Sequence, residues 1–185
     1  MKILHLADLH LGKFVNGLSM IDDQRYVLNS VVDVCKGNNI NHIIIAGDVF
    51  DRSIPSEEAV SLLNEFLSKV VLVNNIKVYM ISGNHDSRER LSLLHELLES
   101  TGLYIDCFIN NDLSMNKHTI LEDGLKINIY QLPYIYPSEI KIQSNDNDIK
   151  DYEASIKKII DSTSINKDEI NIINTHYFIN CIPLK

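Results

Sequence analysis

The apolar run Ile43-Ile44-Ile45-Ala46 restricts the fold more than any other feature of the chain. It is rich in β-branched residues and ends abruptly at Gly47 and Asp48. A continuous run of this kind is typical of a strand whose two faces are both covered, as in a parallel sheet. Covering two faces requires further layers of helix or sheet, so the chain is predicted to be a layered α/β protein.

Strands and helices alternate through the first hundred residues. Strands are predicted at residues 2–6, 42–46 and 77–81, and helices at 21–36, 55–73 and 87–100. Alternation in this rhythm builds βαβ units and therefore a largely parallel sheet. The second half differs, because an Asp-Gly turn between two β-rich runs indicates a hairpin. The hairpin strands are predicted at 118–121 and 125–130, a polar loop at 144–151, a helix at 151–162 and a last strand at 170–174.

Composition excludes several classes of protein. The chain has 185 residues, of which 45% are apolar, and no apolar run approaches the roughly 18 residues of a membrane span. Asp8 and His10 interrupt the apolar N-terminal stretch, which argues against a signal peptide. Cys35, Cys107 and Cys181 match no zinc or redox spacing, so they are expected to be reduced thiols in a cytoplasmic protein. A net charge of −8 argues against a generic nucleic-acid binder.

Four groups of polar residues stand just after the apolar strands. They are Asp8 with His10; Asp48 with Asp51; Asn84 and His85 with Asp86; and His176. Ligands of open α/β sheets bind at the carboxyl ends of the strands, where loops from separate strands converge. The sequence therefore predicts that the four groups form one site.

The chemistry of these residues favours a pair of metal ions. Asp8 and His10 are alternate residues, which share one face of an extended segment. Mixed oxygen and imidazole ligands suit manganese or iron, with zinc as an alternative, and the absence of thiolates argues against a structural zinc site. A carboxylate such as Asp48 can bridge two cations about 3.5–4 Å apart, the spacing used in phosphoryl chemistry. Each motif alone also fits an ordinary turn, but their order after successive strands favours a shared metal site.

The remaining histidines are interpreted as structural. His5 is expected to be a core residue of the first strand, whereas His42, His95 and His118 are expected to be structural or surface residues.

The motifs resemble those of the calcineurin-like metallophosphoesterase superfamily. The matching segments are Asp8-Leu9-His10, Gly47-Asp48-Val49-Phe50-Asp51, Gly83-Asn84-His85-Asp86 and Thr175-His176. Within that superfamily the chain is similar to the SbcD family of bacterial DNA-repair nuclease subunits. That similarity covers His5 to Lys13, Asp23 to Tyr26, Pro55, and Leu132-Pro133-Tyr134 with Pro137. The resemblance implies an α/β sandwich of mixed β-sheets flanked by helices.

The resemblance also implies a role for each motif residue. Asp8 and His10 would hold one metal ion, Asp48 would bridge both, and Asn84 and His176 would hold the second. His85 would contact the scissile phosphate, and Asp86 would orient His85 through a hydrogen bond. Asp51 would not bind a metal ion itself but would support the residues that do. The cofactor would be two divalent ions, manganese first, with magnesium, iron or zinc as alternatives.

The implied activity is that of a DNA nuclease. It would act as a 3′–5′ exonuclease and single-strand endonuclease, hydrolysing phosphodiester bonds with a water activated by two metals. The implied partners are DNA, a second copy of the chain and an SbcC-type coiled-coil ATPase, in double-strand-break repair and recombination. Two alternatives stay open: a phosphoesterase of the same superfamily acting on nucleotides or phosphoproteins, and a scaffold with a decayed site.

One departure from the family concerns the metal ligands. The family takes two further ligands from a downstream Gly-His-x-His motif that this sequence lacks. Residues 1–185 are therefore expected to be an incomplete metallophosphoesterase domain, truncated at its C-terminus, without the capping domain and the ATPase-binding segment. Weak metal binding and little turnover are expected of it alone.

Two surface features concern partners. Candidate phosphate contacts near the motifs are Lys13, Arg25, Arg52, Arg88 and Arg90. The leucine-rich helix predicted at 87–100 presents an apolar stripe broader than one sheet requires. It is either deeply buried or partly turned toward a second subunit.

Overall fold

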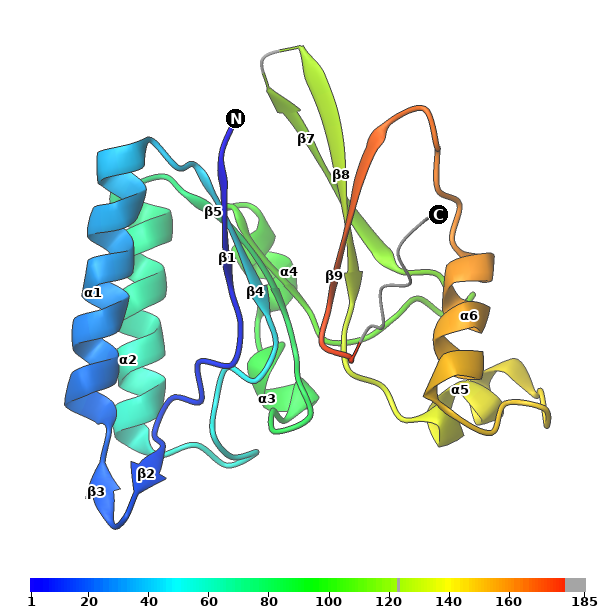
Figure 1. Cartoon of the computed structure of the whole chain (residues 1–185), viewed down its shortest axis with the longest axis horizontal. Coiled ribbons are helices and arrows are strands. Elements are labelled where there is room, and N and C mark those ends of the chain that lie inside the picture. The colour runs from blue at the N-terminus through cyan, green and yellow to red at the C-terminus, as the bar shows by residue number, and fades with distance from the viewer. Residues whose placement is uncertain (123, 179–185) are drawn as a thin grey trace, which may run out of the picture.

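The computed structural model describes residues 1–122 and 124–178. Figure 1 shows four layers: two long helices, a first sheet, a second sheet, and two further helices. The outer layers are α1 (Ile21–Asn38) with α2 (Glu57–Leu67), and α5 (Pro137–Ser144) with α6 (Tyr152–Ser162). Within the described ranges, no helix combines the length and the apolar character needed to cross a membrane.

The first sheet is parallel and confirms the prediction from the isoleucine run. Its strands, in spatial order, are β1 (Ile3–Leu6), β4 (His42–Ala46), β5 (Lys77–Ile81) and β6 (Leu103–Asp106). Ile43 and Ile45 pack in the core beneath α1 and α2, whereas Ile44 packs with Tyr79 and Ile129 between the two sheets. Because side chains alternate along a strand, this one run supplies both cores.

The second sheet is mixed. The strands β7 (Asn116–Glu122) and β8 (Leu125–Leu132) form the predicted antiparallel hairpin, and β9 (Ile170–Thr175) pairs parallel with β8. The chain is thus an α/β protein with two sheets flanked by helices, as expected.

Several elements differ from the predictions at their ends or in kind. The helix predicted at 55–73 is α2 followed by the π-helical segment η1 (Ser68–Val73). The small hairpin of β2 (Phe14–Val15) and β3 (Leu18–Ser19) was not predicted, and neither were β6 and α5.

The continuous helix predicted at 87–100 is wrong. The segment forms two short helices, α3 (Arg88–Leu91) and α4 (His95–Glu99), because Leu94 adopts a left-handed φ of 61° that no α-helix accommodates. Leu91 is buried, but Leu93, Leu94 and Leu97 are 68%, 59% and 69% exposed. The deeply buried helix is therefore excluded, and contact with a second subunit stays a prediction.

His5 is also not the core residue that was expected, since it is exposed. It lies on β1, an edge strand of the first sheet, and lacks the cover that its register partner Ile44 receives. The thiols of Cys35 and Cys107 are buried and free, and burial raises the pKa of Cys107 to about 12. Cys181 lies outside the described residues.

Candidate metal centre

Two loops at the carboxyl edge of the first sheet are joined by main-chain hydrogen bonds. The amide of Asp8 donates to the carbonyl of Gly47 at 3.2 Å, and that of His10 donates to Asp48 at 2.9 Å. The amide of Leu11 then donates to Val49 at 2.9 Å. The pairing of β1 with β4 thus continues past the strands, which places the Asp8 and His10 side chains beside Asp48.

The backbone in these loops is strained at the predicted ligands themselves. Asp8, His10 and Asp48 have φ values of 54°, 43° and 48°. Non-glycine residues rarely occupy this left-handed region, and such conformations persist where the surroundings enforce them, often at functional sites. Here the bonds between the loops enforce them.

Two glycines allow the loops after β4 and β5 to touch. Gly47 has φ 83°, and a Cβ there would lie 2.9 Å from the main chain of Gly83 and from the His176 ring. A Cβ on Gly83 would overlap the amide and carboxylate of Asp48. Glycine at both positions therefore permits the close approach that brings Asp48 to the next loop.

Asp86 does not orient His85, contrary to expectation. Its carboxylate accepts hydrogen bonds from the amides of Val49 at 3.1 Å, Phe50 at 2.9 Å and Gly83 at 2.9 Å. Burial raises the pKa of Asp86, and the three amide bonds oppose that shift. Asp86 therefore joins the second and third motif loops.

The imidazole of His85 is oriented instead by main chain. Its Nδ1 lies 2.9 Å from the carbonyl oxygen of Asp51. A carbonyl only accepts, so Nδ1 carries the proton and Nε2 is left free to accept or to receive a proton.

His176 reaches the centre from the second sheet. The side-chain amide of Asn174, two residues earlier in the chain, donates to the carbonyl of Ile45 at 3.3 Å. His176 Nδ1 donates to the carbonyl of Ala46 at 2.7 Å. These bonds fix β9 against β4. The Nε2 atom of His176 then lies 3.2 Å from Asn84 Oδ1.

The carboxylate of Asp48 stands at the middle of the cluster. Its Oδ2 lies 3.6 Å from His10 Nε2, 3.9 Å from His85 Nε2 and 3.5 Å from His176 Nε2. These separations exceed ordinary hydrogen bonds. Two ligand atoms that bind the same ion at about 2.1 Å, with a tetrahedral angle between the two bonds, lie about 3.4 Å apart. The spacing therefore suits ligands that share an ion.

The donor atoms fall into two groups that could each hold a metal ion. One group is His10, Asp51 and His85, and the other is Asp8, Asp48 and His176, with the ligand atoms of each group within 4.8 Å of one another. The buried Nδ1 of His10 has no hydrogen-bond partner, and the nearest carboxylate oxygen, Asp51 Oδ1, is 3.4 Å away. Carboxylate and imidazole donors without thiolate fit divalent cations of the manganese, iron or zinc type.

The match with known families agrees with this geometry. Residues 1–181 match the family model of the calcineurin-like phosphoesterases. The chain belongs to the calcineurin-like phosphoesterase family. Members of this family hydrolyse phosphoesters with divalent metals, so the clustered side chains form the candidate active site of a metal-dependent hydrolase.

All the predicted site residues of this calcineurin-like phosphoesterase lie at one edge of the first sheet, but they do not group as expected. Asp51, which was expected behind the ligands, has its carboxylate in the same group as His10 and His85. His85, which was expected to contact only phosphate, offers Nε2 toward Asp48 and is 43% exposed.

Gln24 supports the first motif loop, a role that was not predicted. Its Nε2 donates to the carbonyls of Leu9 at 3.1 Å and His10 at 2.7 Å, and its Oε1 accepts from the amide of Gly12 at 3.0 Å. Gln24 lies within the Asp23–Tyr26 segment that carries part of the resemblance, which was the available signal.

The candidate phosphate contacts differ in availability. Arg25 pairs with Glu65, and Arg88 pairs with Glu139 at 2.6 Å. Arg52 is 75% exposed, with its Nε 3.9 Å from Asp51 Oδ2. Lys13 and Arg90 are exposed. Of the five, Arg52 is the cation that the structure places in contact range of a residue of the cluster.

Proposed function

We propose that this calcineurin-like phosphoesterase is a DNA nuclease that hydrolyses phosphodiester bonds, as the SbcD family does. The observation that carries the proposal is the convergence on Asp48 of three imidazoles from three separate loops, with His85 on the open side. The choice of DNA rests on the similarity of the segments around the ligands.

Each residue has a defined task in this proposal. Two divalent ions, manganese first, are held by Asp8, His10, Asp48, Asn84 and His176. Asp51 adds a carboxylate on the side of the site where His10 lies. When bound, the two cations supply an activated water and offset the negative charge of the phosphate. His85 Nε2 faces the phosphate, and once it has taken up a proton it donates that proton or a hydrogen bond to the phosphate oxygens. The hydrogen bond from His85 Nδ1 to the carbonyl of Asp51 keeps the Nε2 atom of the same ring aimed outward.

The overall charge of the protein is compatible with this role. The net charge is −8, yet several of the carboxylates belong to the metal cluster and face cations when the site is loaded. Arg52, whose Nε lies 3.9 Å from Asp51 Oδ2, is then the candidate cation for contact with a phosphate of the DNA strand.

The experiment compares three proteins on end-labelled duplex and hairpin DNA in Mn²⁺. Wild type is expected to shorten the DNA only slowly, since little turnover is expected of residues 1–185 alone, and Asp48→Asn is expected to abolish shortening. Asp33→Asn, at an exposed position of α1, is the matched control and should behave as wild type. The same assay with a longer chain that carries a Gly-His-x-His segment tests whether that segment raises turnover.

The outcome separates the substrates. Intact DNA together with Asp48-dependent hydrolysis of a nucleotide or a phosphopeptide in the same buffer would move the substrate to those classes. Intact DNA and no hydrolysis of any phosphoester, by the longer chain as well, would leave a scaffold with a decayed site.

We further propose that the protein acts in the cytoplasm as a homodimer with an SbcC-type ATPase. Leu93, Leu94 and Leu97 support the dimer, since three exposed leucines on adjacent turns are costly in water unless a partner covers them. Sedimentation equilibrium is expected to give twice the chain mass. Leu94→Lys with Leu97→Lys should give the single mass, whereas Leu72→Lys, at a 69% exposed position of η1, should not.

A further inference from the structure

Four tyrosine rings form a continuous cluster beside the metal centre. Tyr134 lies 5.3 Å from Tyr136, 5.8 Å from Tyr152 and 5.3 Å from Tyr177, and Tyr152 lies 5.9 Å from Tyr177, measured between ring centroids. The Tyr134 ring is also 6.4 Å from that of His176. The cluster therefore begins at a side chain of the metal centre and extends away from it.

Main-chain contacts fix this cluster relative to the motif loops. The amide of Tyr134 donates to the carbonyl of Ser82 at 3.0 Å, and Ser82 immediately precedes the loop of Asn84 and His85. Tyr177 follows His176 directly along the chain. Tyr177 is thus carried by the same segment as His176, and the loop that holds Tyr134 is bonded to the strand end that leads to Asn84 and His85.

The four rings divide into an inner and an outer pair. Tyr177 is held by its hydroxyl, which accepts from the amide of Ile135 at 2.7 Å and donates to the Ile135 carbonyl at 3.1 Å. Burial raises its pKa to about 12, and burial likewise raises the pKa of Tyr134. Tyr134 stacks on Tyr177, with an angle of 23° between the rings. These two residues form the fixed base of the cluster.

The outer pair, Tyr136 and Tyr152, is exposed at 50% and 37%. Tyr136 is the N-cap residue of α5 and Tyr152 is the first residue of α6. The Tyr152 hydroxyl lies 2.6 Å from that of Tyr134. Packing in the hydrophobic core does not explain why two aromatic rings lie partly exposed at the starts of these helices. They are instead partly exposed aromatic rings that contact Tyr134, which itself lies beside the candidate phosphoesterase centre.

We propose that Tyr136 and Tyr152 form a stacking site for a nucleobase of the substrate whose phosphate lies at the metal centre. Nucleobases stack on aromatic side chains without regard to sequence, because every base has a π-face. A ring held by its neighbours loses little conformational entropy on binding. Stacking also gives an acidic protein a grip on nucleic acid that does not depend on positive charge. The inference rests on the proposed function for the position of the phosphate.

The test uses single-stranded DNA that contains 2-aminopurine, a base whose fluorescence is quenched by stacking. Binding is measured in Mn²⁺ in a His85→Ala background, so that the DNA is held with little cleavage. The parent is expected to quench the probe, and Tyr136→Ala with Tyr152→Ala is expected to raise Kd about tenfold and remove the quenching. Tyr136→Phe with Tyr152→Phe keeps the rings without the hydroxyls and should retain both.

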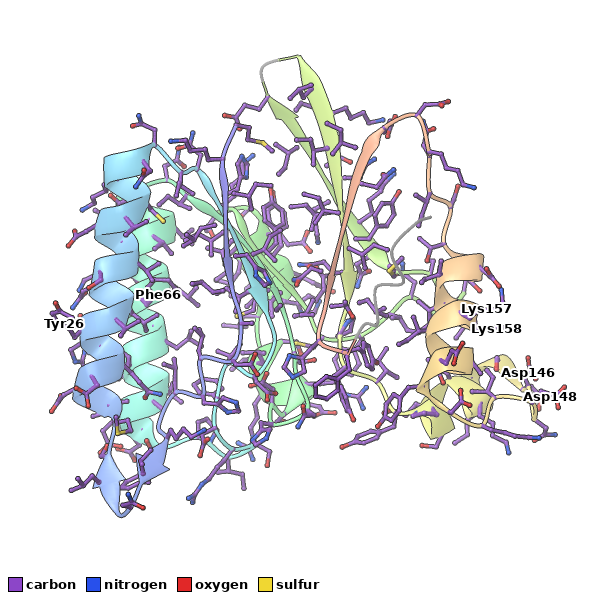
Figure 2. All side chains as sticks on the ribbon, in the orientation of Figure 1. Tyr26, Phe66, Asp146, Asp148, Lys157 and Lys158 are labelled. Atoms are coloured by element: carbon purple, nitrogen blue, oxygen red, sulfur yellow. The ribbon has the colours of Figure 1, made fainter. Side chains whose placement is uncertain are left out.

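The matched control is Tyr26→Ala. Tyr26 is 75% exposed on α1, and Figure 2 shows it at the opposite side of the molecule from α5 and α6. This variant should bind and quench as its parent does.

Three results are decisive. An alanine pair that binds and quenches like its parent contradicts the stacking site, and so does a parent that binds DNA without quenching. Tyrosine-dependent quenching, together with no cleavage of any phosphodiester by a longer chain that retains His85 and carries a Gly-His-x-His segment, keeps the base site and removes the nuclease proposal.

Discussion

Histidines and carboxylates meet in two regions of this molecule with opposite geometry. Between the sheets, His42 Nε2 lies 3.0 Å from Glu122 Oε2, and His118 Nε2 lies 2.6 Å from Asp106 Oδ2. At the metal centre, three imidazoles stay 3.5 to 3.9 Å from Asp48 Oδ2. Direct bonds satisfy both partners and join β7 to the first sheet. The longer separations leave lone pairs aimed at shared space, as ligands of an ion require.

The comparison teaches that separation, rather than composition, distinguishes the structural histidine cluster from the candidate metal centre of this molecule. Histidine and carboxylate residues serve in both regions. Main-chain bonds at His10, His85 and His176 hold the second set apart, and substitutions in the two regions should therefore have different consequences.

The largest expected effect is on catalysis at the metal centre. His85→Ala should lower the rate of phosphodiester hydrolysis about 10²–10⁴-fold, the usual contribution of a positioned acid or base. Its unfolding midpoint should stay near that of wild type, because the ring is 43% exposed. Initial rates on bis(p-nitrophenyl) phosphate and urea melts measure the two effects. A loss of stability without a loss of rate would place His85 with the structural histidines.

The second prediction concerns metal binding. Mn²⁺ at about a hundred times its Kd should raise the free energy of unfolding by about 2.7 kcal/mol for each site. Asp48→Asn should lose most of this gain, since its Oδ2 is the shared centre of the cluster. Asp106→Asn, in the paired region, should retain the gain even though its starting stability is lower. Thermal melts with and without chelator measure the difference, and equal gains in both variants would contradict the assignment.

The third prediction concerns the paired region. His118→Ala should lower the free energy of unfolding by about 1–3 kcal/mol, because it leaves the Asp106 carboxylate, only 10% exposed, without its partner. Hydrolysis by the folded protein should be unchanged. His5→Ala, at an exposed position, is the control and should shift the urea midpoint little. A His118→Ala protein as stable as the control would show that the pair contributes nothing.

The smallest expected effect is a pH dependence of stability. Burial lowers the pKa of His42, and its bond to Glu122 only partly opposes this. Below the ordinary pKa of about 6.5 the unfolded chain takes up a proton that the folded chain resists, so stability should fall as the pH drops through this range. His42→Gln should lose part of this fall between pH 7.5 and 5.5 in urea melts. A slope identical to that of wild type would assign the effect to other groups.

The sequence was a good guide wherever one residue pattern decided the structure. The Ile43 to Ile45 run is typical of a strand with two covered faces, and Gly-Asp after it marked the end of that strand where the candidate ligands lie. The Asp-Gly turn gave the hairpin, and the order of motifs after successive strands brought together Asp8, Asp48 and His85.

Other features depended on competition between contacts distant in sequence. Leucine spacing favoured one helix at 87–100, but Leu91 packs into the core while Leu94 turns outward in a left-handed conformation. The family resemblance likewise implied that Asp86 orients its neighbour His85, although three amides hold its carboxylate. The carboxylate of Asp86 therefore bonds to main-chain amides of two loops and not to the side chain of the residue beside it in sequence.

The bond between His176 Nδ1 and Ala46 has a consequence for the order of assembly during synthesis. The two residues are 130 positions apart, and the strands of the first sheet end at Asp106. At about 5–20 residues per second, the ribosome takes roughly 4–14 s to add the next seventy residues. For that interval a nascent chain has its first three motif loops but no His176. A metal site that includes His176 is therefore completed only after β9 has emerged from the ribosome.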